Sequence, residues 1–436
     1  MAVGKTRMLT PLETRESDVR KSCLVIGGGV AGMTAALTVA ENGFPATLIE
    51  REEKLGGNAA KMRRTLDTDD LPAELDALIA SVKNHPLIEV YEGAEIQDVS
   101  GWIGQFATRF THEGEEKTVE HGTIIVATGA REHLPRSYGY GEDPGIVTQR
   151  EFEHMLDVRH PLLRVARSVA MIQCVESREG DRPGCSRVCC GEAIKNLLRF
   201  RAEYPRKDAT VFYRDMRTYG LLESRYTEAR EAGAVFVRFD IERKPEVIRN
   251  GRCDFTVGVY DSIVGGDIRI PAQIVVLSAG MDPEPGNGDL ARMLKVPLDE
   301  SGYFHEAHVK LRPVEFATDG VFLCGLAHGP KYLGEAAAQA RAAAGRALTV
   351  MTRDTVRSEA NTASVDKNRC SGCGMCADVC AYRAIEIVEG AAVVNELICK
   401  GCGACAAACL SGAIDLRGFT NKQIVKEFEE LFVPVG

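Results

Sequence analysis

Eight of the fifteen cysteines in this chain lie in two matched runs near its C-terminus. Each run has the spacing C-x2-C-x2-C-x3-C, and thiolates spaced in this way hold a pair of [4Fe–4S] clusters. The fourth cysteine of each run binds the cluster of the other run, so the sequence predicts two sites for the transfer of single electrons. The two predicted ligand sets are Cys370, Cys373, Cys376 and Cys409, and Cys399, Cys402, Cys405 and Cys380.

Two structural zinc sites are the alternative, because zinc also takes four thiolates from paired C-x2-C arms. A zinc site usually has a long spacer between its arms, whereas these two runs are compact and matched, which favours clusters. The residue after each fourth cysteine is Ala381 or Leu410 instead of the usual proline, and this difference removes no ligand.

Four more cysteines lie within seventeen residues in the middle of the chain: Cys174, Cys185, Cys189 and Cys190. One thiol there is explained by core packing, but four are not. A disulfide is not expected in a reducing compartment, and the segment has no C-x-x-C dithiol. Thiolate-rich sites select iron–sulfur clusters or zinc, so we expect a third [4Fe–4S] cluster, with zinc or packing as the alternatives. Three cations among the ligands would offset its negative charge: Arg178, Arg182 and Arg187.

A nucleotide site is predicted near the N-terminus. The apolar run 23–26 is followed by Gly27, Gly29 and Gly32 in G-x-G-x-x-G and then by a helical stretch. This order of strand, turn and helix is the context in which the glycines make a turn, approach a pyrophosphate and allow close packing. The helix N-terminus would face the phosphates, and Glu50 at the end of the next strand would accept ribose hydroxyls.

The elements that position these groups belong to a globular protein of several domains, since the chain has 436 residues with 45% hydrophobic and 26% charged content. The net charge of −9 gives no support for nucleic-acid binding. No apolar run approaches the ~18–20 residues that span a bilayer, and the first twenty residues lack the apolar core of a secretion signal. We therefore expect a cytoplasmic protein with no direct membrane insertion.

Three further segments resemble the flavoproteins with two dinucleotide-binding domains, the group that includes thioredoxin reductase. They are residues 55–58 (LGGN), 123–130 (TIIVATGA) and 316–327 (FATDGVFLCGLA). The resemblance implies an α/β fold in which a split FAD domain contains a second, similar domain, followed here by an α+β ferredoxin domain with two clusters. It places the FAD contacts at Gly57, Asn58, Ala127, Thr128, Gly129 and Gly325. Leu326 stands where that family usually has an aspartate that contacts the ribityl chain.

The inserted domain should open with its own glycine motif for NAD(P)H. Its first strand, near residues 168–174, is followed instead by the segment with the four cysteines. Without a glycine turn a second dinucleotide has no backbone cradle, so we expect no direct oxidation of NAD(P)H.

The cysteine pattern C-x10-C-x3-C-C, with GEAIKNLLRFRAEYP and YRDMRTYG after it, resembles the A subunit of heterodisulfide reductase and its relatives in quinone-interacting oxidoreductase and benzoyl-CoA reductase-type complexes. The resemblance covers about residues 21–425 and implies an atypically bound [4Fe–4S] cluster near the flavin. Larger members have an additional N-terminal domain and a ferredoxin inserted after LGGN, whereas residues 58–85 here contain no cysteine. Electron bifurcation is therefore not assumed.

The same family implies a lysine beside the flavin ring in the Gly-Pro-Lys setting, which is Lys331 here. A cation there would favour the reduced, anionic flavin. His328 is the second candidate for a flavin role. The alternatives are a solvated loop lysine and a structural histidine.

The resulting prediction is an oxidoreductase subunit that passes electrons between FAD and iron–sulfur clusters to partner subunits of a complex, with a ferredoxin or a membrane-bound protein among the candidate partners. The alternatives are a free-standing NAD(P)H:acceptor oxidoreductase and a non-catalytic cluster-binding scaffold. The predicted divisions are a polar arm, the first FAD segment, the inserted domain, the second FAD segment, the ferredoxin domain and a C-terminal helix: 1–20, 21–161, 162–280, 281–356, 364–415 and 416–436.

Overall fold

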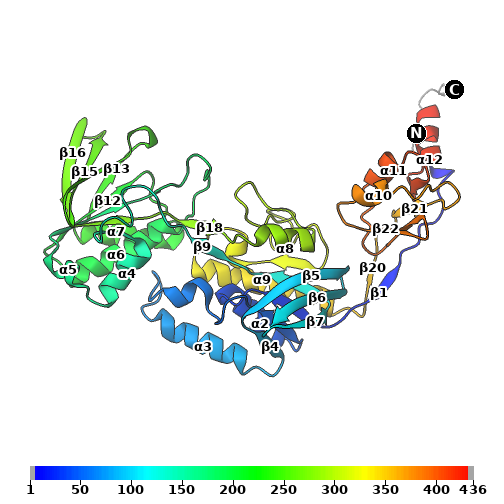
Figure 1. Cartoon of the computed structure of the whole chain (residues 1–436), viewed down its shortest axis with the longest axis horizontal. Helices are drawn as coiled ribbons and strands as arrows, with labels where there is room; N and C mark the ends of the chain where they lie inside the picture. Colours follow the sequence, from blue (N-terminus) through cyan, green and yellow to red (C-terminus); the bar gives the residue numbers. More distant parts are fainter. Residues whose placement is uncertain (1–4, 431–436) are drawn as a thin grey trace.

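The computed structural model describes residues 5–430, so the ends of the predicted N-terminal arm and C-terminal segment lie outside the described residues. Three bodies follow one another along the longest axis of the molecule (Figure 1). The flavin domain is central, the inserted domain lies at one end and the ferredoxin domain lies at the other. The described residues contain no helix that is both long and apolar enough to cross a membrane.

The flavin domain is built on a five-stranded parallel sheet in the order β19-β8-β2-β3-β4. Its strands are β2 (Cys23–Ile26), β3 (Ala46–Ile49), β4 (Ile88–Tyr91), β8 (Thr123–Val126) and β19 (Val321–Leu323). Every residue of β2 and β8 is buried, as expected for strands covered on both faces. The sheet is joined by helices α2 (Val30–Glu41), α3 (Leu71–Lys83), α8 (Asn287–Leu294) and α9 (Leu333–Met351), and by the antiparallel strands β5 (Ala94–Trp102), β6 (Gln105–His112) and β7 (Glu115–His121).

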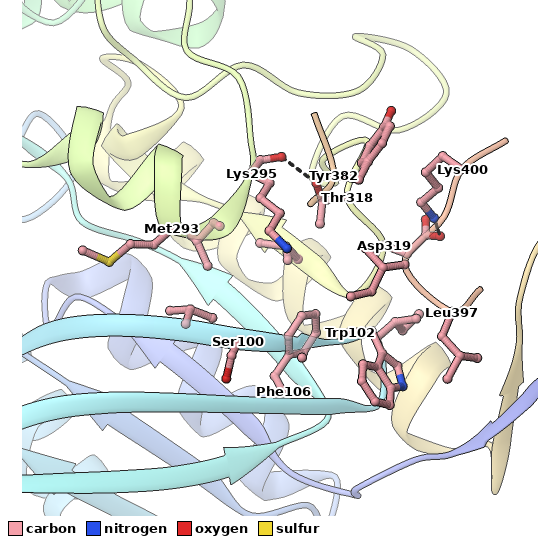
Figure 2. A pocket seen from close by; sticks show the side chains of 16 residues that line it. Ser100, Trp102, Phe106, Met293, Lys295, Thr318, Asp319, Tyr382, Leu397 and Lys400 are labelled. Carbon is pink, nitrogen blue, oxygen red and sulfur yellow. Dashed lines mark hydrogen bonds and ion pairs between the residues drawn. The ribbon is translucent and has the colours of Figure 1, made fainter. Parts of the chain in front are cut away.

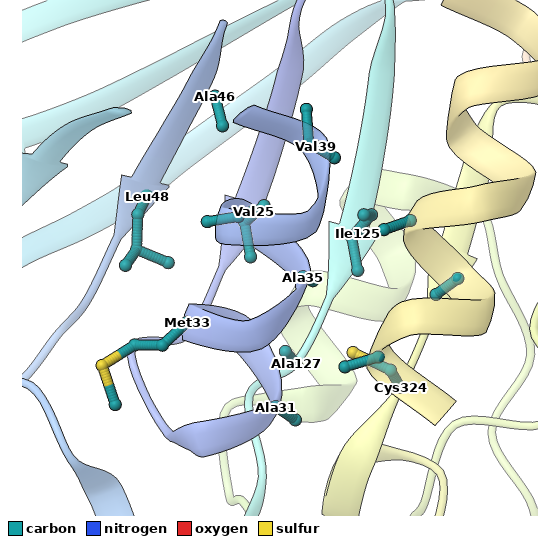
Figure 3. Packing of buried hydrophobic residues seen from close by; sticks show 14 of the residues in the cluster. Val25, Ala31, Met33, Ala35, Val39, Ala46, Leu48, Ile125, Ala127 and Cys324 are labelled. Atoms are coloured by element: carbon teal, nitrogen blue, oxygen red, sulfur yellow. The ribbon is translucent and has the colours of Figure 1, made fainter. Parts of the chain in front are cut away.

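Small side chains allow the central helices to approach this sheet closely. Ala31 and Ala35 of α2 lie against the strands that carry Val25 and Ile125 (Figure 3). The alanine-rich helix α9 packs beside α2 and contributes five fully or almost fully buried alanines to the same core. This packing holds the glycine turn that precedes α2 in a fixed position relative to the sheet.

The inserted domain has a second parallel sheet in the order β10-β17-β11-β12-β13. Its strands are β10 (Ile146–Thr148), β11 (Ser168–Ile172), β12 (Asp208–Tyr213), β13 (Val235–Arg238) and β17 (Ile274–Leu277). Its helices are α4 (Gln149–Asp157), α5 (Pro161–Val165), α6 (Cys189–Glu203) and α7 (Glu223–Glu231). An antiparallel sheet of β14 (Glu246–Gly251), β15 (Asp254–Asp261) and β16 (Gly266–Ala272) completes it.

The boundary predicted at residue 161 is wrong. The strand β10 pairs with β17, and Phe152 of α4 packs with Leu197 of α6, so both elements belong to the inserted domain. The chain crosses between the two domains on β9 (Ala130–Glu132) and returns on β18 (Met281–Pro283), which pair with each other. The strand β10 has only three residues, too few to show the alternation of apolar and polar residues that identifies a strand in a sequence. The sequence therefore predicts the domain boundary after α4, whereas the structure places it before β10.

The ferredoxin domain contains two small antiparallel sheets, β21 (Ala363–Val365) with β24 (Ile414–Leu416) and β22 (Ile385–Val388) with β23 (Ala391–Val394), and two short helices, α10 (Met375–Asp378) and α11 (Ala404–Ala408). The N-terminal strand β1 (Glu16–Asp18) pairs with β20 (Thr355–Arg357) in the segment that leads to this domain. The last helix, α12 (Asn421–Glu429), contacts the N-terminal arm through a hydrogen bond from Gln423 to the carbonyl of Met8. This helix therefore packs on its own chain.

Candidate functional site

The glycine turn after β2 has the geometry of a dinucleotide cradle. A Cβ atom on Gly27, whose φ is +110°, would lie 2.4 Å from the carbonyl oxygen of Ala127, and one on Gly32 would lie 1.8 Å from that of Gly27. These two glycines are required by packing. A Cβ on Gly29 would meet nothing within 4 Å, so its backbone faces open space, where a pyrophosphate can approach.

The other predicted FAD contacts gather around this turn at the carboxyl ends of the strands. Gly57 lies against Gly29, Gly325 lies against Ala31, and Gly129 faces open space. These positions suit the residue types predicted for FAD, because a side chain at Gly57 or Gly325 would crowd the cradle. Thr128, directly after Ala127, donates its hydroxyl to Asn287 at 3.2 Å.

Glu50 closes the same end of the sheet. One oxygen of its carboxylate accepts the N–H of Gly28 at 2.5 Å, and the other accepts the N–H of Glu52 at 2.8 Å. The second lone pairs of these oxygens stay available for ribose hydroxyls, as the sequence predicts. Asn58 donates to the carbonyl of Ala130 at 2.5 Å, which ties the LGGN segment to β9.

A cavity of about 510 Å³ opens between the flavin domain and the inserted domain. Its wall is mostly apolar, with a few polar groups from both domains, which is the usual character of a cofactor or substrate pocket. It brings Asn58, Lys331 and Cys189 to one space, although they are far apart in sequence. The cavity therefore connects the flavin cradle to the middle cysteine segment.

Lys331 lies in this cavity, folded back over its own loop. Its ammonium donates to the carbonyls of Gly325 at 2.5 Å and Gly329 at 2.6 Å. Burial lowers the pKa of Lys331 to about 8, and the charge of Arg187 lowers it further. The side chain is thus not the solvated lysine of the alternative interpretation.

His328 does not line the cavity. One ring nitrogen interacts with the carboxylate of Glu306 and the other with the amide of Gln339, each at 2.8 Å. Burial lowers the pKa of His328, although its contact with Glu306 opposes this. With both nitrogens engaged, the ring holds α9 to the loop at Glu306, and this geometry favours the structural interpretation of His328.

The four middle cysteines lie between the end of β11 and the start of α6, although within residues 5–430 no three cysteine, histidine or carboxylate side chains are arranged so as to hold a metal ion. Burial raises the pKa of Cys189 well above its ordinary value, and the neighbouring charges that raise it further are those of Cys190, Cys174 and Cys185. Burial also raises the pKa of Cys190 to about 12. Neutral thiols are therefore favoured in the metal-free chain, and metal binding would have to release their protons.

The backbone of this segment is strained. Four residues that are not glycine adopt left-handed φ values between 49° and 65°: Cys174, Glu176, Arg178 and Arg187. Such conformations persist only where surrounding contacts impose them, and they concentrate at functional sites. Next to Cys174, the side-chain amide of Gln173 is buried with neither its nitrogen nor its oxygen hydrogen-bonded. Gln173 and Cys174 line a separate cavity of about 700 Å³ whose lining residues include no other cysteine of the set, so this unpaired amide gives no support for a four-thiol site.

The three arginines of this segment are engaged by carboxylates. Each forms an ion pair with a carboxylate: Arg178 with Asp215 at 2.8 Å, Arg182 with Asp282 at 2.8 Å and Arg187 with Glu335 at 3.1 Å. The side chain of Arg178 also contacts Cys174, and the backbone N–H of Arg187 donates to the sulfur of Cys185 at 3.3 Å. These pairs anchor the segment to the loop after β12, to β18 and to α9. Burial raises the pKa of Cys174, and the charge of Arg178 opposes this rise.

In the ferredoxin domain, four cysteines that lie in different runs line one small pocket: Cys380, Cys399, Cys402 and Cys405. This is the crossed ligand set predicted from the spacing. Backbone N–H groups of Ala384 and Ala363 point at the sulfurs of Cys380 and Cys399, at 3.3 and 3.4 Å. Ala392 and Ala413 do the same for Cys370 and Cys409 in the other set. N–H groups aimed at sulfur are the second-sphere contacts that tune such clusters.

Sequence reasoning missed the polar contacts that join the two large domains. Arg150 at the start of α4 donates to Asn58 at 3.3 Å and pairs with Glu132 at 3.3 Å. Lys195 of α6 donates to the carbonyl of Arg64 in the flavin domain at 3.3 Å, and its buried partner Glu153 of α4 accepts the backbone N–H of Arg64 at 3.2 Å. One sequence signal could have located Arg150: the capping box Thr148-x-x-Glu151 marks the start of α4, where this arginine lies.

Comparison with known proteins identifies the class of protein to which this fold and this site belong. Residues 21–172 match the family described as pyridine nucleotide-disulphide oxidoreductase, and residues 369–413 match the 4Fe-4S dicluster domain. Among solved structures, the thioredoxin reductases of T. acidophilum and Lactococcus lactis each superpose with a TM-score of 0.52 at 16% and 17% identity, over 76% of this chain and 100% and 99% of theirs. The molecule is a flavoprotein oxidoreductase of the thioredoxin reductase-like fold with a C-terminal dicluster ferredoxin domain, as predicted.

Relatives of similar sequence identify the family within this class. The iron-sulfur A subunit of the CoB--CoM heterodisulfide reductase of Methanocaldococcus jannaschii is 33% identical over 97% of this chain and 79% of its own length. The A subunit of the H(2):CoB-CoM heterodisulfide,ferredoxin reductase of Methanothermobacter marburgensis is 33% identical over 98% of this chain and 79% of its own length. The chain belongs to the family of heterodisulfide reductase A subunits, and it is an oxidoreductase subunit with flavin and iron–sulfur domains.

Proposed function

We propose that this chain is the FAD- and [4Fe–4S]-containing electron-transfer subunit of a multisubunit oxidoreductase. The observation that supports this most directly is the shared cavity, which joins the flavin cradle to Cys189 of the middle cysteine set. In the flavoproteins of this fold a second glycine cradle would follow β11. Here that turn consists of Gln173 and the left-handed Cys174, so it lacks the glycines through which a backbone approaches a pyrophosphate.

In this proposal the cofactors are one FAD and three [4Fe–4S] clusters. FAD, when bound, connects two-electron with one-electron chemistry, and the clusters handle single electrons. The chain itself orients the dinucleotide through the glycine turn and Glu50, and it keeps Lys331 positively charged at neutral pH beside the cavity. The third cluster would be held by Cys174, Cys185, Cys189 and Cys190.

The proposed partners are other redox subunits of a hetero-oligomeric complex. Relatives of this chain are named as the A subunits of a Ferredoxin:CoB-CoM heterodisulfide reductase in Methanosarcina mazei and of a Ferredoxin/F(420)H(2)-dependent CoB-CoM heterodisulfide reductase in Methanosarcina acetivorans. By analogy with these names, a ferredoxin is the first partner to test. The final substrate site would then belong to another subunit.

The test is anaerobic purification of the native complex, followed by counting iron and flavin and identifying the chains that co-purify. We expect about twelve iron atoms and one FAD per chain, since three clusters of this type contain four irons each. Adding NADH or NADPH to the isolated chain should leave the flavin oxidised. Rapid flavin reduction by either nucleotide would instead favour a free-standing NAD(P)H oxidoreductase, and a chain without flavin would favour a scaffold.

A further inference from the structure

A pocket lies between the flavin domain and the ferredoxin domain (Figure 2). The flavin domain contributes Trp102, Phe106 and Lys295, and the ferredoxin domain contributes Tyr382 and Leu397. Lys400 of the ferredoxin domain and Asp319 of the flavin domain also line the pocket, and they form an ion pair with each other. The two domains are thus in direct contact around this pocket.

Only one of the two cysteine sets of the ferredoxin domain is next to this contact. Tyr382 and Lys400 line the interdomain pocket and also the small pocket formed by Cys380, Cys399, Cys402 and Cys405. Neither pocket includes a member of the other set. Exposure does not separate the two sets, since Cys373 and Cys402 are both exposed. The shared lining residues Tyr382 and Lys400 therefore place the side of the domain with Cys380 and Cys399 next to the flavin domain.

Lys295 stands out among the residues of the interdomain pocket. It follows α8 and extends into the pocket from the flavin domain (Figure 2). Within residues 5–430 its ammonium has no hydrogen bond and no ion pair, although the side chain is partly buried. Burial lowers the pKa of Lys295 and Arg383 lowers it further, whereas the charges of Cys380 and Asp98 raise it. A cation that forms no ion pair thus lies within electrostatic range of Cys380, a predicted cluster ligand, and of the carboxylate of Asp98.

The backbone at Lys295 supports a role for its side chain. The residue caps α8 in the left-handed conformation, with φ 57° and ψ 46°. Glycine or asparagine is preferred at such a position, because a Cβ atom there costs free energy. A lysine at this position could simply interact with the end of the helix dipole. Its side chain instead extends into the interdomain pocket, and in the described part of the chain its ammonium bonds to no carbonyl of α8.

We propose that Lys295 raises the reduction potential of the cluster held by Cys380, Cys399, Cys402 and Cys405, and that this cluster is the one that faces the flavin domain. Reduction of a cluster adds one electron and therefore one negative charge. A nearby cation that has no carboxylate partner stabilises the reduced form more than the oxidised form. This inference rests on the proposed function, because it requires the clusters of the ferredoxin domain to be present.

The test is a redox titration of the anaerobically purified complex, followed by electron paramagnetic resonance. In Lys295→Gln we expect one cluster to become about tenfold harder to reduce, a shift of about 59 mV for a one-electron couple. Cys373→Ser marks the other cluster by altering its spectrum, so the shifted signal can be assigned. The potential of the marked cluster should not change.

Three matched variants separate charge from structure. Lys295→Arg keeps the cation and should keep the potential near that of the wild type. Lys295→Gly removes the charge and relieves the left-handed backbone, so it should lower the potential without lowering the melting temperature. Lys117→Gln removes a lysine from β7, at the end of the antiparallel sheet away from Trp102, and should leave both potentials unchanged.

An equal shift of both clusters, a shift of the marked cluster alone, or no shift in Lys295→Gln would overturn the inference. Iron counts distinguish this failure from that of the proposed function. If the ferredoxin domain of the purified complex contains no iron, the proposed function fails as well. If it contains about eight irons with normal spectra and Lys295→Gln changes nothing, only the role of Lys295 is lost.

Discussion

Near the flavin cradle, the fold lowers the pKa of Lys331. Two carbonyls of its own loop hold the ammonium, and burial lowers its pKa to about 8. The group is therefore charged at pH 7 and loses its proton as the pH rises through about 8. Burial has the opposite effect on Cys189 in the middle set: it raises the pKa of the thiol, which therefore stays neutral until a metal displaces the proton.

The first prediction concerns this lysine. In Lys331→Met the reduction potential of the bound flavin should fall by about 30 mV at pH 7, equivalent to about tenfold for a two-electron couple. The difference from the wild type should shrink above pH 8, because the native ammonium is then neutral. Spectroelectrochemical titration between pH 6 and 9 measures it. Lys331→Arg should preserve the wild-type potential at pH 7, and a constant difference across this pH range would contradict the assignment.

The second prediction concerns the middle cysteine set. The double variant Cys189→Ser with Cys190→Ser should lose about four irons per chain and keep its FAD, because the flavin cradle is formed by other elements. Iron and flavin are counted after anaerobic purification. Cys253→Ser is the control, since this thiol lies apart from the set and contacts Asp143. Retention of all iron in the double variant would count against a third cluster.

Helices α4 and α6 hold the inserted domain against the flavin domain. Glu153 of α4 accepts the backbone N–H groups of Arg63 and Arg64 from the loop after the LGGN segment, at 3.3 and 3.2 Å. Lys195 of α6 pairs with the same carboxylate and also donates to the carbonyl of Arg64 at 3.3 Å. Because Lys195 is 4% and Glu153 is 2% exposed, neither charge can be satisfied by water.

The third prediction follows from this buried pair. Lys195→Met should lower the stability by about 3–5 kcal/mol, since it leaves the carboxylate of Glu153 buried without its cation. Thermal or denaturant unfolding measures the effect. The pair Arg292–Asp289 on α8 is exposed, and Arg292→Met should cost less than about 1 kcal/mol. Adding Glu153→Gln to Lys195→Met should recover part of the loss, and a failure to exceed the exposed control would argue against the buried pair.

Across the whole molecule, the first and last described segments of the chain lie together on the ferredoxin domain. Lys5 pairs with Glu427 of α12 at 3.3 Å and lies 3.9 Å from the centre of the Phe419 ring. The side chain of Gln423 is buried and donates to the carbonyl of Met8 at 3.0 Å. The N-terminal arm thus forms part of the ferredoxin domain in space, although it precedes the flavin domain in sequence.

The fourth prediction tests this contact. Removing residues 1–12 should increase hydrogen exchange in α12 by about tenfold, equivalent to about 1.4 kcal/mol of local stability, because Gln423 and Glu427 lose their partners. Mass spectrometry of exchanged peptides measures the change. Exchange in α2 of the flavin domain is the internal control and should stay the same. Unchanged exchange in α12 would show that the arm contributes nothing to its stability.

The sequence by itself determined the features that depend on a few neighbouring residues. The spacing of the ferredoxin cysteines places them on short turns, and a Cβ atom on Gly32 would collide with the carbonyl of Gly27 in the same glycine turn. These are local properties of the backbone, so the cofactor-binding motifs and the fold class could be predicted.

Tertiary structure decided the features that depend on segments far apart in the chain. The three-residue strand β10 belongs to the inserted domain because it pairs with β17, which is far away in the sequence. The sequence alone therefore predicts the start of that domain too late. Arg182 and Arg187 are drawn away from the cysteines by carboxylates on β18 and α9. The position of Lys295 near Cys380 likewise exists only once two domains meet. Charge pairing and burial act through space, so no local pattern in the sequence records them.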